Sequence, residues 1–258
     1  MEVLDSGFLL LITAAFIAGG IDAVVGGGGL IQIPALFSVY PTHSAGTLFG
    51  TNKFSSIFGT ASAAIRYFRQ VKIPWRIVLP ATLAAFLFSF LGAMAVAWIP
   101  KYSLRPLMLV LLILAAVYTL KMPDFGKLHC PSISGRRQWI YAVLLGGLIG
   151  FYDGFFGPGT GSFLIFLFIR FFGFDFLHAS ASAKLVNVAT NLAALAYFVP
   201  NGLWLPLISM TMAVSNVAGA QLGTRLALRY GNRFIRRVFL VTVMLLIARF
   251  ALDTLKAY

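Results

Sequence analysis

Long apolar segments separated by short polar loops run through the whole chain. Two shorter apolar pieces, 29–40 and 160–173, each follow a glycine-rich break. The first has 12 residues and reaches about 18 Å as a helix, which is too short for a hydrocarbon core of about 30 Å. We predict that these pieces belong to broken helical hairpins, which either re-enter or cross a membrane. The segments long enough to span it are 7–25, 46–68, 75–98, 102–120, 139–156, 178–199, 203–226 and 234–252.

The chain repeats itself when the sequence is shifted by 131 positions. We predict two structural repeats, residues 1–122 and 139–258, joined by a cytoplasmic linker at 123–138. Each repeat would hold three transmembrane helices and one glycine-broken hairpin. The fold class is therefore an all-α polytopic membrane protein of about 8–10 membrane segments. The residues that coincide without a gap are Gly19 and Gly150, Asp22 and Asp153, Gly26 and Gly157, Gly28 and Gly159, Lys53 and Lys184, Gly92 and Gly223, and Arg105 and Arg236.

Basic residues gather in three loops between apolar segments, 66–76, 121–138 and 225–237. This placement predicts that all three loops are cytoplasmic. The counterpart of loop 66–76 in the second repeat, 199–204, carries no charge and should lie outside. Equivalent loops on opposite sides predict inverted repeats, as in many secondary transporters, with both termini outside. The net charge of +13 thus belongs to membrane loops, and no basic soluble domain exists to bind nucleic acid.

The two breaks, "DAVVGGGG" and "DGFFGPGT", place glycines just before a short helix. Backbone N–H groups at a helix N-terminus are unpaired and carry partial positive charge, and glycine lets a ligand approach them. Inside a membrane, an anion would satisfy such groups. Close helix packing is the alternative use of these glycines. The residues expected to bind the substrate at the breaks are Gly27, Gly28, Gly29, Gly159, Thr160 and Ser162.

Two lysines, Lys53 and Lys184, lie well inside apolar segments. A charge at such a depth is costly and usually functional, so each lysine could face the substrate, together with the neighbouring Asn52 and Asn187. Each could instead be structural and pair with the aspartate of its own half. Those aspartates could also carry a coupling proton, since burial and a nearby lysine shift a carboxyl pKa in opposite directions. The expected pairs are Asp22 with Lys53 and Asp153 with Lys184.

The composition gives no support for a metal, a cofactor or catalysis. The single cysteine, Cys130, excludes a cysteine-based metal site, and the histidines His43, His129 and His178 have no metal-ligand spacing. The chain has seven acidic residues, and those expected in the membrane are not clustered as a Mg²⁺-dependent lipid transferase would need. No serine–histidine pair is expected deep in the helices, as a membrane protease would need. We therefore do not expect an enzyme.

Four stretches carry a family resemblance: "GGIDAVVGGGGLIQIPAL", "GTNKFSSIFGTASAAIRYF", "GFYDGFFGPGTGSF" and "SASAKLVNVATNLAALAYF". Together they closely resemble the TauE/SafE family, the sulfite exporter or toluene sulfonate uptake permeases, and within it the YfcA-like probable membrane transporters. The resemblance implies a multi-pass protein of the bacterial inner membrane that moves small sulfur-containing anions, such as sulfite, sulfonates or sulfoacetate, without a cofactor. One departure is the second break, "GPGTG", which lacks four consecutive glycines. The positions that match the family motifs are Asp22, Gly26 to Gly29, Asn52, Lys53, Asp153, Gly157, Gly159, Lys184 and Asn187.

The repeat, the breaks and the buried charges together predict a secondary transporter that works by alternating access. A small anion would sit near the midplane between two glycine-capped half-helices, with Lys53 and Lys184 offsetting its charge. One alternative is an anion channel or passive pore built on the same repeat, and another is a membrane scaffold subunit that transports nothing. The expected partners are the small anionic substrate, the lipid bilayer and a coupling proton.

Overall fold

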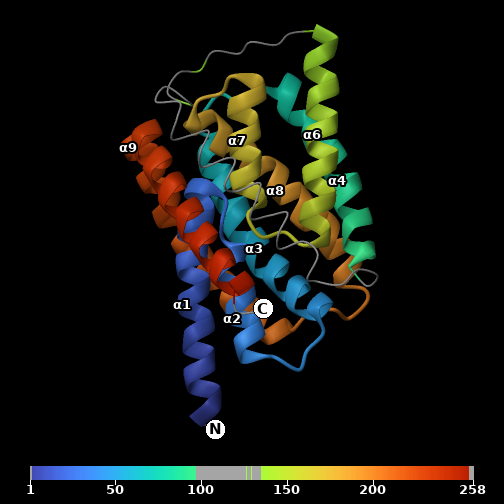
Figure 1. The fold of residues 1–258 in the computed structure, drawn as a ribbon, viewed down its shortest axis with the longest axis vertical. Coiled ribbons are helices and arrows are strands. Elements are labelled where there is room, and N and C mark those ends of the chain that lie inside the picture. The colour runs from blue at the N-terminus through green and yellow to red at the C-terminus, as the bar shows by residue number, and fades with distance from the viewer. Residues whose placement is uncertain (1, 97–125, 127–128, 130–134, 256–258) are drawn as a thin grey trace.

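The computed structural model describes residues 2–96, 126, 129 and 135–255. Over these residues the chain forms helices and no strands, as the apolar pattern predicts. The predicted segment 102–120 and most of the linker lie outside the described residues. The helices are α1 (Glu2–Val25), α2 (Gly29–Val39), α3 (Ala45–Phe68), α4 (Trp75–Ala95), α6 (Gly135–Phe155), α7 (Thr160–Phe172), α8 (Phe176–Phe198) and α9 (Pro206–Leu255) (Figure 1).

The helix bounds follow the predicted apolar segments closely. The long α9 contains a non-helical residue, Gly231 (φ 62°, ψ −154°), so it consists of two helices that correspond to the segments 203–226 and 234–252. Within the described part of the chain, two stretches combine the length and mean hydropathy of a membrane span, namely Gly7–Val25 and Trp75–Ala95. The interiors of α3 and α8 carry buried polar side chains, which lower their mean hydropathy.

The outer helices of each half pack against the other half. α1 lies along α9, and α6 lies along α4 (Figure 1). Gly19 of α1 meets Asn216 of α9, and Gly150 of α6 meets Ala85 of α4, so closely that a Cβ on either glycine would collide with the facing backbone. Small residues allow this approach between membrane helices. A shift of 131 positions relates Gly19 to Gly150 and Ala85 to Asn216, so the two contacts are equivalent. The same helix contact therefore occurs twice, with the roles of the two halves exchanged.

The central helices α3 and α8 pack against each other and run antiparallel. Gly50, near the start of α3, contacts Phe198 at the end of α8 and Leu203 just beyond it. α3 has 24 residues and is about 36 Å long. Loop 66–76, which follows α3, therefore lies at the opposite end of the molecule from its counterpart, loop 199–204.

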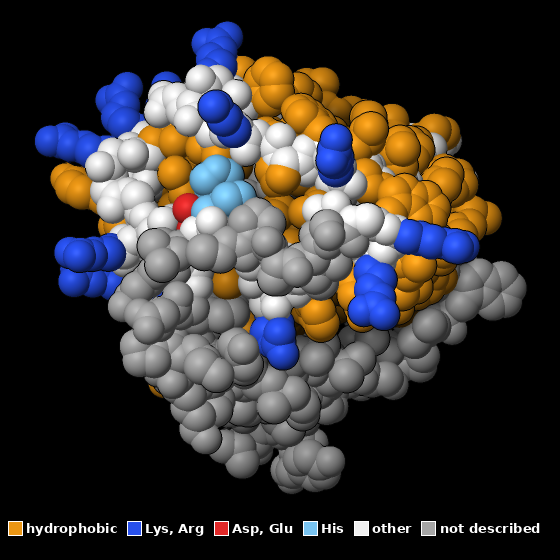
Figure 2. Space-filling view, turned by 90° about the horizontal axis from the view of Figure 1, so that it is seen from above, with side chains coloured by type: hydrophobic (Ala, Val, Ile, Leu, Met, Phe, Trp, Pro, Cys, Tyr) orange, Lys and Arg blue, Asp and Glu red, His pale blue; other side chains and the backbone are white. Residues whose placement is uncertain are grey.

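One end of the molecule is basic. Arg66 at the end of α3 and Arg225 in α9 line the same cleft, so the loops predicted at 66–76 and 225–237 share this end. Figure 2 looks onto it and shows Lys and Arg side chains distributed around its edge. Several exposed Lys and Arg side chains thus gather at this end of the helical bundle, which is the distribution expected for the cytoplasmic end of a membrane protein.

The exterior is apolar and the interior is partly polar. Leu148 of α6 and Leu207 and Val214 of α9 are each more than 70% exposed. Lys53 and Lys184, by contrast, are almost completely buried. A soluble monomer seldom exposes so many large apolar side chains, whereas a lipid-facing surface requires them. The fold therefore places its chemistry inside the bundle, between the two halves.

Candidate functional site

The two glycine breaks meet inside the helix bundle. The backbone N–H of Ser162 donates a hydrogen bond to the carbonyl oxygen of Gly26, with 3.2 Å between nitrogen and oxygen. A Cβ on Gly26 would collide with Gly161. Gly26, Gly157 and Gly159 have φ angles of 76°, 89° and 84°, which glycine adopts without strain. The first break therefore lies directly against the start of α7.

A small polar cavity lies at this contact. Its volume is about 30 Å³, which leaves room for one or two water molecules. Five pairs of lining residues are equivalent in the two repeats: Asp22 and Asp153, Gly26 and Gly157, Gly29 and Thr160, Ser56 and Asn187, and Thr60 and Asn191. The other lining residues are Asn52, Lys53, Gly159 and Gly161. The cavity wall is therefore built from both halves.

Two buried ion pairs adjoin the cavity, and both cross between the halves. Lys53 Nζ lies 2.9 Å from Asp153 Oδ2, and Lys184 Nζ lies 3.1 Å from Asp22 Oδ2. The expected pairs within each half, Asp22 with Lys53 and Asp153 with Lys184, are therefore wrong. The reason is the packing of the central helices, because the antiparallel α3 and α8 bring each lysine next to the break of the opposite half. Lys53 Nζ, for example, lies beside Gly157.

The two lysines differ in their access to the cavity. Lys53 lines the cavity, and its ammonium group also donates to Asn191 Oδ1 at 3.4 Å. Lys184 is fully buried and does not line the cavity, and its partner Asp22 also accepts a hydrogen bond from Thr60 Oγ1 at 3.1 Å. Lys53 is therefore the ammonium group that a ligand in the cavity can reach.

Several polar groups at the cavity have no hydrogen-bond partner among the described residues. The backbone N–H groups of Gly29 and Gly161, at the starts of α2 and α7, find no acceptor there. Asn52 Oδ1 and Asn187 Oδ1 are buried and unpaired. Gln32, one turn further along α2, is fully buried with both side-chain amide atoms unpaired. Buried polar groups normally have partners, so this concentration of unpaired groups indicates a site for a polar ligand or ordered water.

Some of the expected substrate-binding residues serve the packing of the breaks. A Cβ on Gly28 would meet the carbonyl oxygen of Ala18, and one on Gly27 would meet Thr242. The Ser162 hydroxyl donates to the carbonyl oxygen of Val25 at 2.8 Å. None of the three lines the cavity. The packing interpretation of the glycine breaks thus applies to Gly27 and Gly28.

Thr60 lines the cavity although the sequence did not single it out. The available signal was its spacing, because Thr60 follows Lys53 by seven positions, as Asn191 follows Lys184. Two helical turns place such residues on one face. Thr60 and Asn191 could therefore have been found by looking for polar residues that share a helical face with a buried lysine in both repeats.

A second polar cluster lies at the basic end, where Figure 2 shows histidine side chains beside an acidic one. His129, Asp175 and His178 present possible ligand atoms within 4.8 Å of one another. His178 Nδ1 lies 2.8 Å from Asp175 Oδ1, and the rings of His129 and His178 are stacked with centroids 4.0 Å apart. Asp175 is the N-cap residue of α8, since its carboxylate accepts a hydrogen bond from the backbone N–H of His178 at 2.7 Å. The cluster is therefore a hydrogen-bonded cap at the start of α8. His129 joins it from a distant part of the chain.

Burial and charge perturb the pKa values in this cluster. The His129 side chain is exposed, but partial desolvation lowers its pKa, and the neighbouring His178 lowers it further, while Asp175 acts in the opposite sense. Burial alone would raise the pKa of Asp175, but its hydrogen bonds from His178 outweigh burial and hold the pKa below the ordinary value. Both shifts favour a neutral His129 beside a charged Asp175 near neutral pH.

Comparison with known proteins places the chain among membrane transporters. The family described as "Sulfite exporter TauE/SafE" matches residues 11–250. The chain is 35% identical to "Probable membrane transporter protein ORF9" of a Sinorhizobium species, over 94% of the chain and 92% of the relative. It is 32% identical to "Probable membrane transporter protein YfcA" of Escherichia coli K12, over 98% of the chain and 96% of the relative. No solved structure matches the chain.

Proposed function

The chain belongs to the sulfite exporter TauE/SafE family of membrane transporters, and we propose that it is a secondary transporter of a small anion. The substrate class is a sulfur-containing oxyanion such as sulfite, a sulfonate or sulfoacetate. The membrane is the bacterial inner membrane, which the chain crosses several times. Transport proceeds by alternating access between the two halves.

The observation that carries this proposal is the cavity between the glycine breaks. The unpaired N–H groups of Gly29 and Gly161 stand at the starts of two short helices, where the helix dipole favours negative charge. Asn52 and Asn187 add side-chain amides, and Lys53 adds an ammonium group. A pyramidal or tetrahedral oxyanion carries several acceptor oxygens, so it matches a wall that offers donors from several directions.

A proton accompanies the anion in this proposal. Lys53 is already paired with Asp153, and Lys184 with Asp22, so that two buried ion pairs adjoin the cavity, and Asp22, Lys53 and Asp153 line it. An anion that binds to Lys53 leaves the Asp153 carboxylate unpaired in a poorly solvated site, which is costly. Protonation of Asp153 removes that cost and frees Lys53. Anion and proton binding are therefore linked.

Alternating access requires the contact between the two halves to open. The cavity in this conformation holds one or two water molecules, and an ion with four or more heavy atoms requires more room. The breaks must therefore separate for the anion to enter. The equivalent contacts of Gly19 with Asn216 and of Gly150 with Ala85 support inverted repeats, in which the same rocking motion can open either side.

Counterflow in proteoliposomes tests the proposal. The purified protein is first screened by thermal shift against sulfite, sulfoacetate, taurine, thiosulfate and simple carboxylates, and the best ligand is used in radiolabelled form. A carrier should show saturable uptake that is accelerated by unlabelled substrate inside the vesicles. Uptake that neither saturates nor responds to internal substrate would instead identify a passive pore, and no uptake of any of these anions would overturn the proposal.

A further inference from the structure

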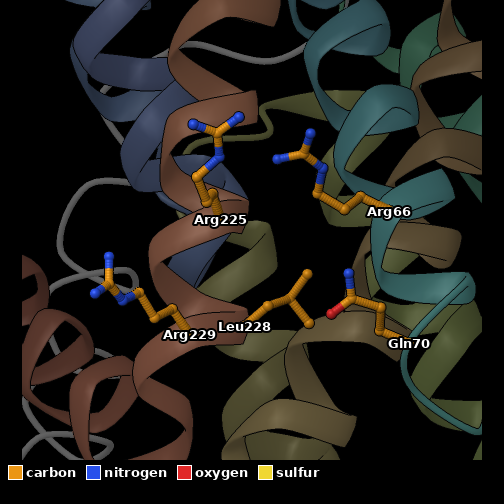
Figure 3. Close-up of a pocket in the computed structure, with 5 residues that line it drawn as sticks. All are labelled: Arg66, Gln70, Arg225, Leu228 and Arg229. Atoms are coloured by element: carbon orange, nitrogen blue, oxygen red, sulfur yellow. The ribbon is translucent and has the colours of Figure 1, made fainter.

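A cationic cleft lies between α3 and α9 at the basic end of the molecule (Figure 3). It has a volume of about 390 Å³ and is lined by Arg66, Gln70, Arg225, Leu228 and Arg229. Figure 3 shows Arg66 of α3 and Arg225 of α9 facing each other across the gap. No acidic residue lines the cleft within the described part of the chain. Arginines that approach one another without a carboxylate repel, and an anion between them would remove that repulsion.

The cleft is separate from the central cavity. Arg66 follows the cavity residue Thr60 by six positions, which turns it by about 240° around the axis of α3. Tyr67 fills the inner face of the helix at this level, since it is fully buried and its hydroxyl donates to the carbonyl oxygen of Ala23 at 3.1 Å. A ligand in the cleft therefore sits at the periphery of the bundle and not on the transported substrate's site.

A second cleft of about 210 Å³ shares Arg66 and Gln70 and adds Arg69, Gln221, Ser62 and Ile65. Arg66 donates one hydrogen bond to the carbonyl oxygen of Gln221, at 3.1 Å from Nη1. This bond fixes the guanidinium group while its other N–H groups remain for a ligand. Planar guanidinium groups bind phosphate oxygens in pairs, so the two clefts together suit a phosphate group.

Exposed apolar side chains border the same surface. Ile65 lines the second cleft, and it and Phe68 are each 55% exposed, while Leu222 of α9 is 47% exposed. A free inorganic anion would not be stabilised by contact with these apolar side chains. A phospholipid carries a phosphate directly above its acyl chains, and basic pockets between transmembrane helices on the cytoplasmic side bind anionic headgroups. We propose that this cleft binds the headgroup of an anionic phospholipid from the cytoplasmic leaflet, with its acyl chains along α3 and α9.

Native mass spectrometry of the purified protein, titrated with phosphatidylglycerol and with phosphatidylcholine, tests this site. The wild type should bind phosphatidylglycerol more tightly, and Arg66→Gln together with Arg225→Gln should abolish most of the preference, by about fivefold for each arginine. The matched control is Arg136→Gln with Arg137→Gln, which removes the same charge from the start of α6 at the same end. This control should change the affinity less than twofold. Melting temperatures check that both variants fold.

Three results would overturn the proposal. The first is a wild type without preference for phosphatidylglycerol, and the second is an equal loss of affinity in the control variant, which would indicate diffuse surface charge. The third comes from soluble glycerol phosphate, which carries the same anionic group without acyl chains. If it binds the cleft as tightly as the lipid does and depends on the same arginines, the site belongs to a free anion.

Discussion

Lys53 and Asp153 form a buried ion pair across the two halves of the chain, with 2.9 Å between Nζ and Oδ2 and 100 positions between the residues. Lys184 and Asp22 form the equivalent pair with the halves exchanged. Both pairs adjoin the contact of the two glycine breaks. A motion that separates the breaks must therefore break or exchange these pairs, which makes them the connection between ligand binding and the arrangement of the halves.

The crossed pairing can be tested by removing charges in combination. Lys53→Gln leaves Asp153 buried without a partner and should cost about 3–5 kcal/mol of stability, while adding Asp153→Asn should recover most of it. Melting temperatures in detergent measure the effect. The matched double variant is Lys53→Gln with Asp22→Asn, which breaks both crossed pairs and should be less stable than either single variant. Recovery in this second double variant would show that each lysine pairs within its own half.

The contact between the breaks predicts an unequal response of two glycines. Gly26 and Gly135 both have positive φ angles, so alanine strains either by about 1–2 kcal/mol. A Cβ on Gly26 would also collide with Gly161, whereas one on Gly135 meets nothing within 4 Å. Gly26→Ala should therefore lower the melting temperature much more than Gly135→Ala. Equal melting temperatures would mean that the two breaks do not touch.

Ser162 and Asn187 should respond differently although the sequence placed both in the substrate site. The Ser162 hydroxyl donates to the backbone of Val25, so Ser162→Ala should cost about 1 kcal/mol of stability and leave the anion dissociation constant within about twofold. Asn187 lines the cavity, and its side-chain NH₂ group can donate to an anion there, so Asn187→Ala should weaken anion binding by about tenfold. Isothermal titration calorimetry and thermal unfolding separate the two effects, and the reverse pattern would contradict the assignment.

The histidine cluster predicts a loss of stability in mild acid. Partial desolvation and His178 hold the pKa of the exposed His129 below its ordinary value of 6.5, so protonation favours the unfolded chain by a small amount. The stability contributed by neutral His129 is present above that value and is lost as the pH falls from about 6.5 through the folded-state pKa. Over this pH range, the melting temperature of the wild type should fall further than that of the His129→Gln variant. His43→Gln is the control, since it lies outside the cluster and should behave like the wild type.

The helices and the positions of the breaks could be predicted because their signals are local. The 12 residues of segment 29–40, which follow a run of glycines and end before Pro41, predict the short α2, and the spacing of Asp22 and Asp153 predicts that the two breaks are equivalent. Apolar length and glycine content depend on neighbouring residues in the chain. For this reason the expected segments 46–68 and 178–199 coincide with α3 and α8 to within about two residues.

The partners across the bundle could not be predicted in the same way. A sequence repeat shows which residues are equivalent, but it does not show which half a side chain faces, so the only ion pair that the sequence suggested for Lys53 was with Asp22 of its own half. His129 and His178 are 49 positions apart and meet through tertiary packing alone. The division of the glycines into packing and cavity-lining residues likewise depends on neighbours such as Thr242, which lie far away in the chain.

The central claim is that Lys53 and the N–H donors around it hold an anion between the halves. The most direct test is the anion dissociation constant of the Lys53→Gln, Asp153→Asn double variant, measured by isothermal titration calorimetry with the ligand found by thermal shift. Because this variant keeps the cavity neutral, it should melt near the wild type yet bind the anion at least about tenfold more weakly. A folded double variant with wild-type affinity would contradict the account.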